Sequence, residues 1–158
     1  MSTTTTTMAA RAQNPLLRFP KAFQGMQTIH AAAAEGGLPE STAQLVHLRA
    51  SQINGCSFCA RMHAAELRAG GARDERIDTV AAWREAPYFT DAERVALAVT
   101  ESLTRLADRP DPISDELWDE LREHYDEGAI AALLIEIGLI NVWNRVNAAV
   151  RQVAGPVG

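Results

Sequence analysis

The chain has 158 residues, of which 47% are hydrophobic and 22% charged, and its formal net charge at pH 7 is −5. That length fits one domain with a substantial core, and the Ala- and Leu-rich composition favours helices over a β-sandwich or a barrel. Nucleic-acid binding is not expected, because the sequence lacks the basic cluster that neutralises phosphates. We therefore predict an all-α fold.

The first 14 residues contain a Ser/Thr run and lack the apolar segment of a secretory signal. We expect residues 1–14 to be a disordered tail, the protein to be cytoplasmic, and residues 15–154 to form the helical domain. The first helix is predicted over residues 23–35, because Gly36 and Gly37 can end it with a left-handed cap.

The next two predicted helices lie on either side of an Asn-Gly break at residues 54–55. One starts near Pro39, which suits a first helical turn, and carries apolar residues at near-helical spacing. The other begins at Cys56 or Ser57 and ends at a Gly-Gly pair at residues 70–71.

Two more helices are predicted over residues 74–84 and 91–106. The second of these opens with a capping box, in which the Thr90 and Glu93 side chains accept hydrogen bonds from each other's backbone N–H groups. After a linker with two prolines, Ser114 is expected to cap a short helix.

The last predicted helix begins after Asp126 and reaches toward residue 150. It is apolar almost all round, so it has to be buried inside the fold or between subunits. Its most apolar stretch, residues 129–142, is interrupted by Glu136 and Asn141 and is too short to span a bilayer, so no membrane association is expected. In total we predict a compact bundle of about six or seven helices that self-associates.

Cys56 and Cys59 form a Cys-x-x-Cys motif, and His63 follows one helical turn later. Residues three and four apart share one face of a helix, so the three side chains should converge. An imidazole beside a thiol can accept its proton and increase the fraction of nucleophilic thiolate. The positive end of a helix also stabilises a thiolate at Cys56, and such a pair can close into a disulfide and reopen. The motif therefore indicates two-electron redox chemistry.

Two other interpretations of the cysteine pair stay open. The thiols could be structural, since buried cysteines are common. They could also bind zinc, but the further ligands would have to come from His30, His47 or His124, none of which has the usual paired spacing. No metal and no cofactor are expected.

Three segments carry a wider resemblance: LVHLRASQINGCSFCARMHAAELRAGG, WREAPYFTDAERVALAVTESLTRL and INVWNRVNAAVR. Together they resemble the alkylhydroperoxidase D-like (AhpD-like) branch of the carboxymuconolactone decarboxylase family, over residues 15–154. The resemblance implies an all-helical domain that assembles as a homo-oligomer, a trimer or a hexamer. It also implies a thiol peroxidase activity without haem, flavin or metal.

By this resemblance Cys59 attacks the peroxide and becomes a sulfenic acid, Cys56 resolves it to a disulfide, and His63 belongs to the proton relay. The residues themselves leave the order open, because the helix start favours a thiolate at Cys56 whereas the spacing to His63 favours Cys59. We expect Cys59 to be the attacking residue.

One position departs from the family pattern. Twelve residues before the first motif cysteine the family usually has a Glu of the relay, and here Gln44 takes that place. A Gln hydrogen-bonds but carries no proton, so the relay is either rebuilt or weakened. His47, three residues on and on the same helix face, is a candidate substitute, with a surface or packing role as its alternative.

We thus predict an oxidoreductase that reduces hydrogen peroxide or organic hydroperoxides and is re-reduced by a dithiol or a disulfide reductase. One alternative is a non-enzymatic redox or stress-response module with a switchable disulfide, which the missing Glu favours. The other is lactone decarboxylation, which would leave the paired cysteines without a purpose. The scattered Trp83, Trp118 and Trp143 are interpreted as packing residues.

Overall fold

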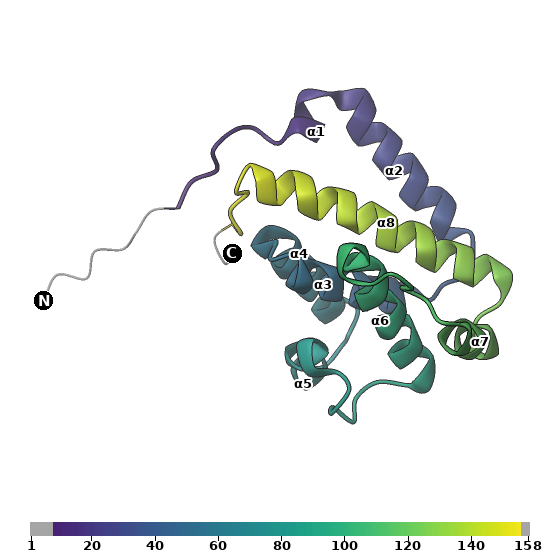
Figure 1. The fold of residues 1–158 in the computed structure, drawn as a ribbon. Helices are drawn as coiled ribbons and strands as arrows, with labels where there is room; N and C mark the ends of the chain where they lie inside the picture. Colours follow the sequence, from purple (N-terminus) through teal and green to yellow (C-terminus); the bar gives the residue numbers. More distant parts are fainter. Residues whose placement is uncertain (1–7, 156–158) are drawn as a thin grey trace, which may run out of the picture.

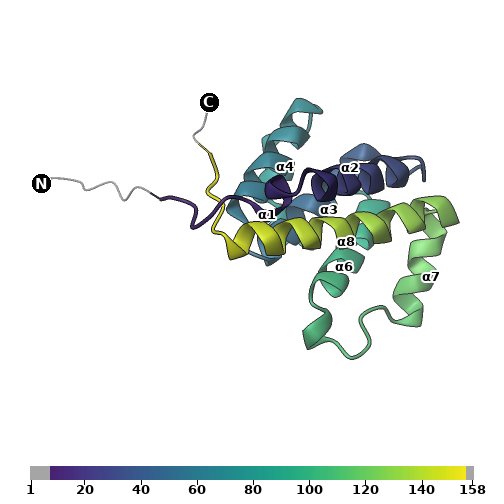
Figure 2. The same ribbon diagram turned by 90° about the horizontal axis from the view of Figure 1, so that it is seen from above.

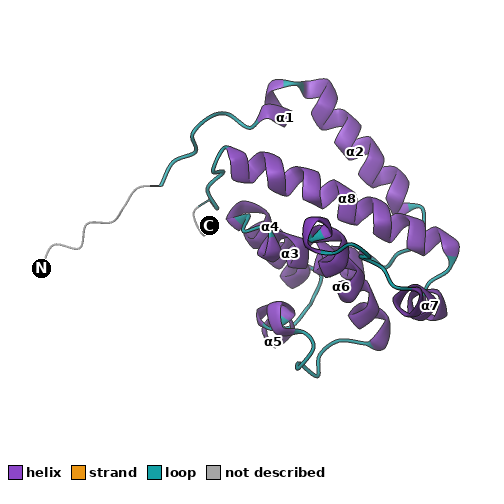
Figure 3. Ribbon diagram, viewed as in Figure 1, coloured by secondary structure: helices purple, strands orange, loops and turns teal. Residues whose placement is uncertain are grey.

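All regular structure in residues 8–155, the part of the chain that the computed structural model describes, is helical (Figures 1 and 3). The prediction of an all-α fold is confirmed, with eight α-helices of which two are only four and five residues long. How many copies associate stays a prediction. The helices are α1 Pro15–Arg18, α2 Pro20–Ala34, α3 Glu40–Ile53, α4 Ser57–Ala69, α5 Asp74–Asp78, α6 Asp91–Thr104, α7 Asp115–His124 and α8 Glu127–Ala149.

The predicted caps are confirmed at three helix starts. Thr90 and Glu93 form the reciprocal capping box of α6, with N···O distances of 3.2 and 2.9 Å. Ser114 caps α7 by accepting from Leu117 N–H, and Asp126 caps α8 in the same way. These side chains satisfy N–H groups that a helix start leaves unpaired, so the boundaries were readable from the sequence.

The prediction of a single helix over residues 74–84 is wrong. Helix α5 ends at Asp78, and a short 3-10 turn, Val80–Ala82, follows. The buried apolar residues of this segment recur at intervals of three, a period that a 3-10 turn places on one side better than an α-helix does. They are Ile77, Val80, Trp83 and Ala86.

Helix α8 is the centre of the bundle. Figure 1 shows α2 on one side of it and α3, α4 and α6 on the other, and Figure 2 shows α7 crossing near its start. Helix α8 has 23 residues and is longer than the apolar stretch, residues 129–142, that we judged too short to span a bilayer. By length and composition alone it is the one described helix that could cross a membrane. Here it packs among the other helices, with Ile135 and Val142 exposed on its outer side.

Helix α3 lies between two apolar clusters. Val46 faces a cluster shared with α6, α7 and α8, whereas Leu45 and Leu48 face a second one with α4 and the segment around Trp83. A third and smaller cluster contains Cys56, Cys59, Ala50 and Ile140. The two thiols therefore lie where α3, α4 and α8 meet.

The described part of the predicted tail, residues 8–14, forms no helix but makes contacts with the end of α8. Arg11 N–H donates to Val150 O at 2.8 Å, and the buried Asn14 caps α1 and donates to Asn147 Oδ1 at 2.5 Å. Residues 1–7 lie outside the described residues, so disorder of the tail stays a prediction.

Helix α2 is held against α8 by a close approach of two glycines. A Cβ at Gly36 would lie 2.5 Å from Gly128 O and 2.8 Å from Ala132 Cβ, both too short for ordinary contact. The two backbones can meet here only without a side chain, and this fixes the distance between the C-terminal end of α2 and the start of α8.

We predict opposite effects of alanine at two glycines of this region. Gly36→Ala should lower the free energy of unfolding by about 1–3 kcal/mol through overpacking, whereas Gly25→Ala, inside α2 with open space around it, should raise it by about 0.5–1 kcal/mol through helix propensity. Urea denaturation followed by circular dichroism measures both. Equal effects of the two variants would contradict the close approach.

Candidate functional site

Cys56 is the N-cap of α4, and its sulfur accepts a hydrogen bond from Cys59 N–H at 3.5 Å. The turn that delivers it depends on Gly55, which has a φ of 67°, a conformation that residues with side chains rarely adopt. Both cysteines are free thiols and both are buried. The predicted position of the motif at the helix start is confirmed.

Polar side chains of α8 hold this turn in place. Asn54, just before it, donates to Asn141 Oδ1 and Asn144 Oδ1, each at 3.0 Å. Asn144 is fully buried and donates to Ser51 Oγ at 3.0 Å. One turn on, Asn147 Nδ2 donates to Cys59 Sγ at 3.2 Å. A buried amide needs such partners, so the turn and α8 fix one another.

The pKa values of the two thiols are shifted in opposite directions. The hydrogen bond from the Cys59 thiol lowers the pKa of Cys56 to about 6, and the Cys59 N–H and the amides of Asn144 and Asn147 act in the same direction against burial. The same shared hydrogen bond, together with burial, raises the pKa of Cys59 above its usual value. The shared hydrogen bond therefore favours a thiolate at Cys56 and a thiol at Cys59.

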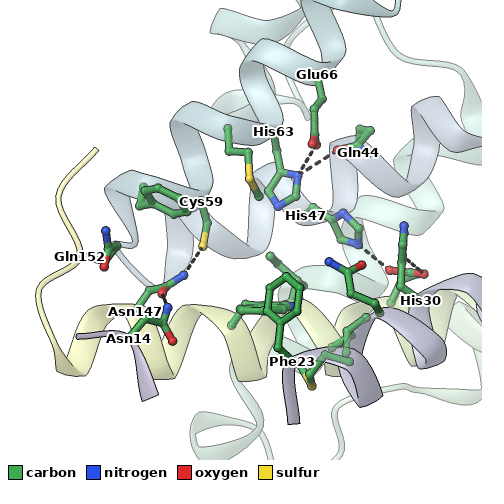
Figure 4. Close-up of a pocket in the computed structure, with 18 of the residues that line it drawn as sticks. Asn14, Phe23, His30, Gln44, His47, Cys59, His63, Glu66, Asn147 and Gln152 are labelled. Carbon is green, nitrogen blue, oxygen red and sulfur yellow. Dashed lines mark hydrogen bonds and ion pairs between the residues drawn. The ribbon is translucent and has the colours of Figure 1, made fainter. Parts of the chain in front are cut away.

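His63 lies on the same helix as Cys59 but does not bond to it in the described structure. In Figure 4 the Cys59 sulfur points toward Asn147, while His63 Nδ1 faces Gln44 Oε1 and Glu66 Oε2, each at 2.9 Å. Burial, followed by the charges of His47 and His30, lowers the pKa of His63 to about 3. The ring is therefore neutral, with its proton on Nδ1 and a lone pair on Nε2.

His47 is paired with a carboxylate that sequence analysis did not single out. Its Nε2 lies 2.8 Å from Glu136 Oε2, and His30 Nδ1 lies 2.8 Å from Glu136 Oε1. The rings of His47 and His63 are 4.7 Å apart between centroids. Gln44 and His47, both named from the sequence, thus contact different partners: Gln44 holds His63, and His47 holds Glu136.

Two buried ring nitrogens lack a hydrogen-bond partner among the described residues, His47 Nδ1 and His63 Nε2. Both residues line one cavity of about 390 Å³, shown in Figure 4. Cys59 lines it too, whereas Cys56 does not. The cavity walls are mostly apolar, and they include Leu17, Phe23, Met26, Phe58, Met62, Leu139, Ile140 and Trp143.

Trp143 is a packing residue, as predicted, but it also contributes to the site. It packs edge-on against Phe23, with centroids 5.8 Å apart, and forms part of the cavity wall. Trp83 is a buried packing residue, as predicted, and its Nε1 donates to Glu101 at 3.0 Å. Trp118 is exposed on α7. The positions of the three tryptophans in the sequence did not show which of them lines the cavity.

The zinc interpretation receives no support from the arrangement of side chains. Within residues 8–155 no group of three or more His, Cys, Asp or Glu side chains is placed to hold a metal ion. His30 and His47 bond to Glu136, and His124 lies at the end of α7 beside a different cleft.

Glu136, Asn147 and Glu66 are the site residues that the sequence analysis missed, and His30 was considered only as a candidate zinc ligand. One signal was present: Glu136 is a charged residue inside an apolar helix, where an unpaired carboxylate would be costly. It was taken only as an interruption of the apolar stretch. The contacts of His30 and Asn147 depend on how α2 and α8 pack, which sequence spacing does not reveal. Glu66 lies three residues after His63 on α4, a spacing that could also have indicated their contact.

We predict that one thiolate forms far below the usual cysteine range. The thiolate absorbance of the reduced protein should rise with a midpoint near pH 6 from Cys56, and Cys59→Ala, which removes the main hydrogen-bond donor, should move that midpoint upward. Cys56→Ser should abolish the step. A step that survives in Cys56→Ser would assign the acidic thiol to Cys59 instead.

Comparison with known proteins supports the expected resemblance. A model of the carboxymuconolactone decarboxylase family matches residues 19–102. The uncharacterised protein YdfG of Bacillus subtilis is 34% identical over 130 residues, which cover 82% of this chain and 87% of the relative. A crystal structure of a protein of unknown function from Agrobacterium tumefaciens, described as a candidate antioxidant defence protein AhpD, is 33% identical with a TM-score of 0.85, and the match covers 95% of this chain and 100% of that one.

More distant structures share the fold alone. The debrominase Bmp8, solved with 2,3,4-tribromopyrrole, is 17% identical with a TM-score of 0.77, over 89% of this chain and 74% of that one. The AhpD core of a peroxidase-related protein from Ralstonia eutropha is 19% identical with a TM-score of 0.76, over the same shares of the two chains. The family match and the close relatives together show that this chain belongs to the carboxymuconolactone decarboxylase family and has the AhpD-like fold.

Proposed function

We propose that the protein is a thiol peroxidase that reduces organic hydroperoxides through a cycle between the Cys56–Cys59 dithiol and its disulfide. The observation that carries the proposal is the position of Cys59, which lines the cavity while sharing a proton with the acidic Cys56 behind it. A nucleophile at the cavity wall and a resolving thiol next to it are the two parts that such a cycle needs.

The proposed reaction starts when the Cys59 proton moves along the shared hydrogen bond to Cys56. The Cys59 thiolate then attacks the terminal oxygen of the hydroperoxide, the O–O bond breaks, and the leaving alkoxide takes a proton and departs as an alcohol. Cys59 is now a sulfenic acid. The Cys56 sulfur attacks it, a disulfide forms, and water leaves with the Cys56 proton. Two electrons have passed from the two thiols to the peroxide.

The two unpartnered nitrogens match the two ends of a hydroperoxide group. His63 Nε2 carries a lone pair and can accept a hydrogen bond from the terminal O–H. His47 Nδ1, once protonated, can donate to the oxygen that bears the organic group. In this proposal His63 orients the substrate beside Cys59 and is not the base that the sequence suggested.

An external reductant has to close the cycle. Both thiols are buried, so the disulfide is reached only through the cavity or after a local opening. We propose a dithiol or a disulfide reductase as the electron donor, as expected from the sequence, in a reducing cytoplasm.

A redox module without turnover is the second candidate. The low exposure of both sulfurs and the Gln at position 44 favour it, because each slows a peroxidase. In that case the disulfide would form slowly and would not be renewed by added dithiol.

The two cysteine variants should separate these candidates. Wild type should consume many equivalents of an organic hydroperoxide in the presence of a dithiol, Cys59→Ser should consume none, and Cys56→Ser should consume one equivalent and stop as a sulfenic acid that a dimedone probe captures. Peroxide loss and mass spectrometry measure the outcomes. Wild type that forms its disulfide without turnover would favour the redox module.

The apolar walls should make the protein prefer bulky organic hydroperoxides. Trp143→Ala should lower kcat/KM for cumene hydroperoxide by about tenfold or more, because the aromatic group loses apolar surface that it would bury, and should change that for hydrogen peroxide by less than about twofold. Trp118 is exposed on α7 and lies outside the cavity, so Trp118→Ala is the matched control and should change kcat/KM for neither peroxide. A parallel loss with both peroxides would show that Trp143 does not contact the organic group.

A further inference from the structure

Glu136 occupies an unusual place for a carboxylate. It lies in the middle of the central helix α8, its side chain is only 4% exposed, and both of its oxygens are taken by imidazoles, His30 on one and His47 on the other, each at 2.8 Å. Burial alone would raise the pKa of Glu136, but its hydrogen bond with His47, the charge of His47 and the contact with His30 lower it. The group is thus a buried negative charge placed against two rings.

The two imidazoles at the cavity have unequal partners. His63 Nδ1 is held by the uncharged Gln44 and by Glu66, whose side chain is 46% exposed and shared with solvent. His47 is held by the buried charge of Glu136. A carboxylate in a dry site favours a positive ring beside it far more than an exposed one does. When one proton is available to the two rings, it therefore belongs on His47.

We infer that Glu136 is a positioning residue that orients His47 and stabilises its positive ring, so that His47 Nδ1–H protonates the leaving oxygen of the hydroperoxide. The inference rests on the proposed function. It replaces the relay carboxylate that is missing at Gln44 with one from α8, which acts on His47 instead of His63.

The proton balance of the cycle is complete with this assignment. At the start the pair holds a Cys56 thiolate and a Cys59 thiol, and His47 holds one extra proton. At the end the leaving oxygen carries the His47 proton, and the released water carries the thiol proton and the hydroperoxide proton. His47 is then neutral, and it regains its proton when the disulfide is reduced.

The other titratable groups around Glu136 come from other helices. His30 comes from α2, His63 and Glu66 come from α4, and Glu40 of α3 acts on Glu66. The carboxylates of α6, Glu93 and Glu101, are each paired with arginines. After removal of the Glu136 charge, the remaining carboxylate that acts on His47 is Glu66, which is 46% exposed and bonds to His63 instead.

The test compares two oxidants with different leaving groups in a Cys56→Ser background, where a single oxidation of Cys59 is followed. An alkoxide needs a proton to leave, whereas the carboxylate released by a peracid does not. Glu136→Gln, which keeps the shape and can still hydrogen-bond to both rings, should slow oxidation by cumene hydroperoxide about 10–100-fold and oxidation by perbenzoic acid less than about twofold.

The pH profile gives a second readout. Glu136→Gln should change the pH dependence of the alkyl hydroperoxide rate, because the negative charge beside the His47 ring is gone. The peracid profile should keep its shape. Glu66→Gln is the comparison variant, since it removes the other carboxylate beside an imidazole, and it should change the ratio of the two oxidants much less than Glu136→Gln does.

Failure of the inference differs from failure of the proposed function. If Glu136→Gln slows both oxidants equally, or neither, Glu136 has no role in leaving-group protonation, although the peroxidase still stands. If Cys59 of the wild-type protein reacts with neither oxidant, the proposed function itself is wrong. Should Glu136→Gln not fold, His47→Gln tests the same acid and should give the same selective loss with cumene hydroperoxide.

Discussion

The structure depends on the polar side chains buried along the central helix. Helix α8 is apolar on nearly all sides, so other helices could pack on it in several rotations and registers with similar apolar burial. Glu136, Asn141, Asn144 and Asn147 remove this freedom, since each loses water in the core and must find its partner on another segment. Their partners are on α2, α3, the turn before α4 and Cys59. The contacts that select one packing are the ones that build the site.

Local signals accounted for most of what the sequence predicted. Capping side chains at Thr90, Ser114 and Asp126 and glycines after helix ends act within one turn, so they can be read without knowledge of the fold. The Cys-x-x-Cys motif was readable for the same reason, because its two members are placed by a single helix start. The segment around Val80 was misjudged, since a period of three and a period of 3.6 differ little over so few residues.

The remaining features of the site are products of tertiary packing. Spacing on α4 correctly placed His63 one turn beyond Cys59, but it could not show that the ring turns toward Gln44 and Glu66 while the sulfur turns toward Asn147. The acidity of the two thiols is likewise set by which one donates to the other, a choice that depends on the Cys59 N–H and the amides of α8. A single sequence shows that these groups exist but not which of them meet.

The division of the cavity between two parts of the chain has an evolutionary consequence. The sulfurs and His63 come from α4 and its N-terminal turn, whereas Leu17, Phe23 and Met26 come from α1 and α2, which pack chiefly on α8 and on each other. Most residues of α2 face outward, so its cavity-facing side chains can be replaced with little disturbance to the core. Sequence drift in α1 and α2 can therefore reshape the cavity without disturbing the two cysteines, and these two helices are the natural place to randomise when this scaffold is engineered.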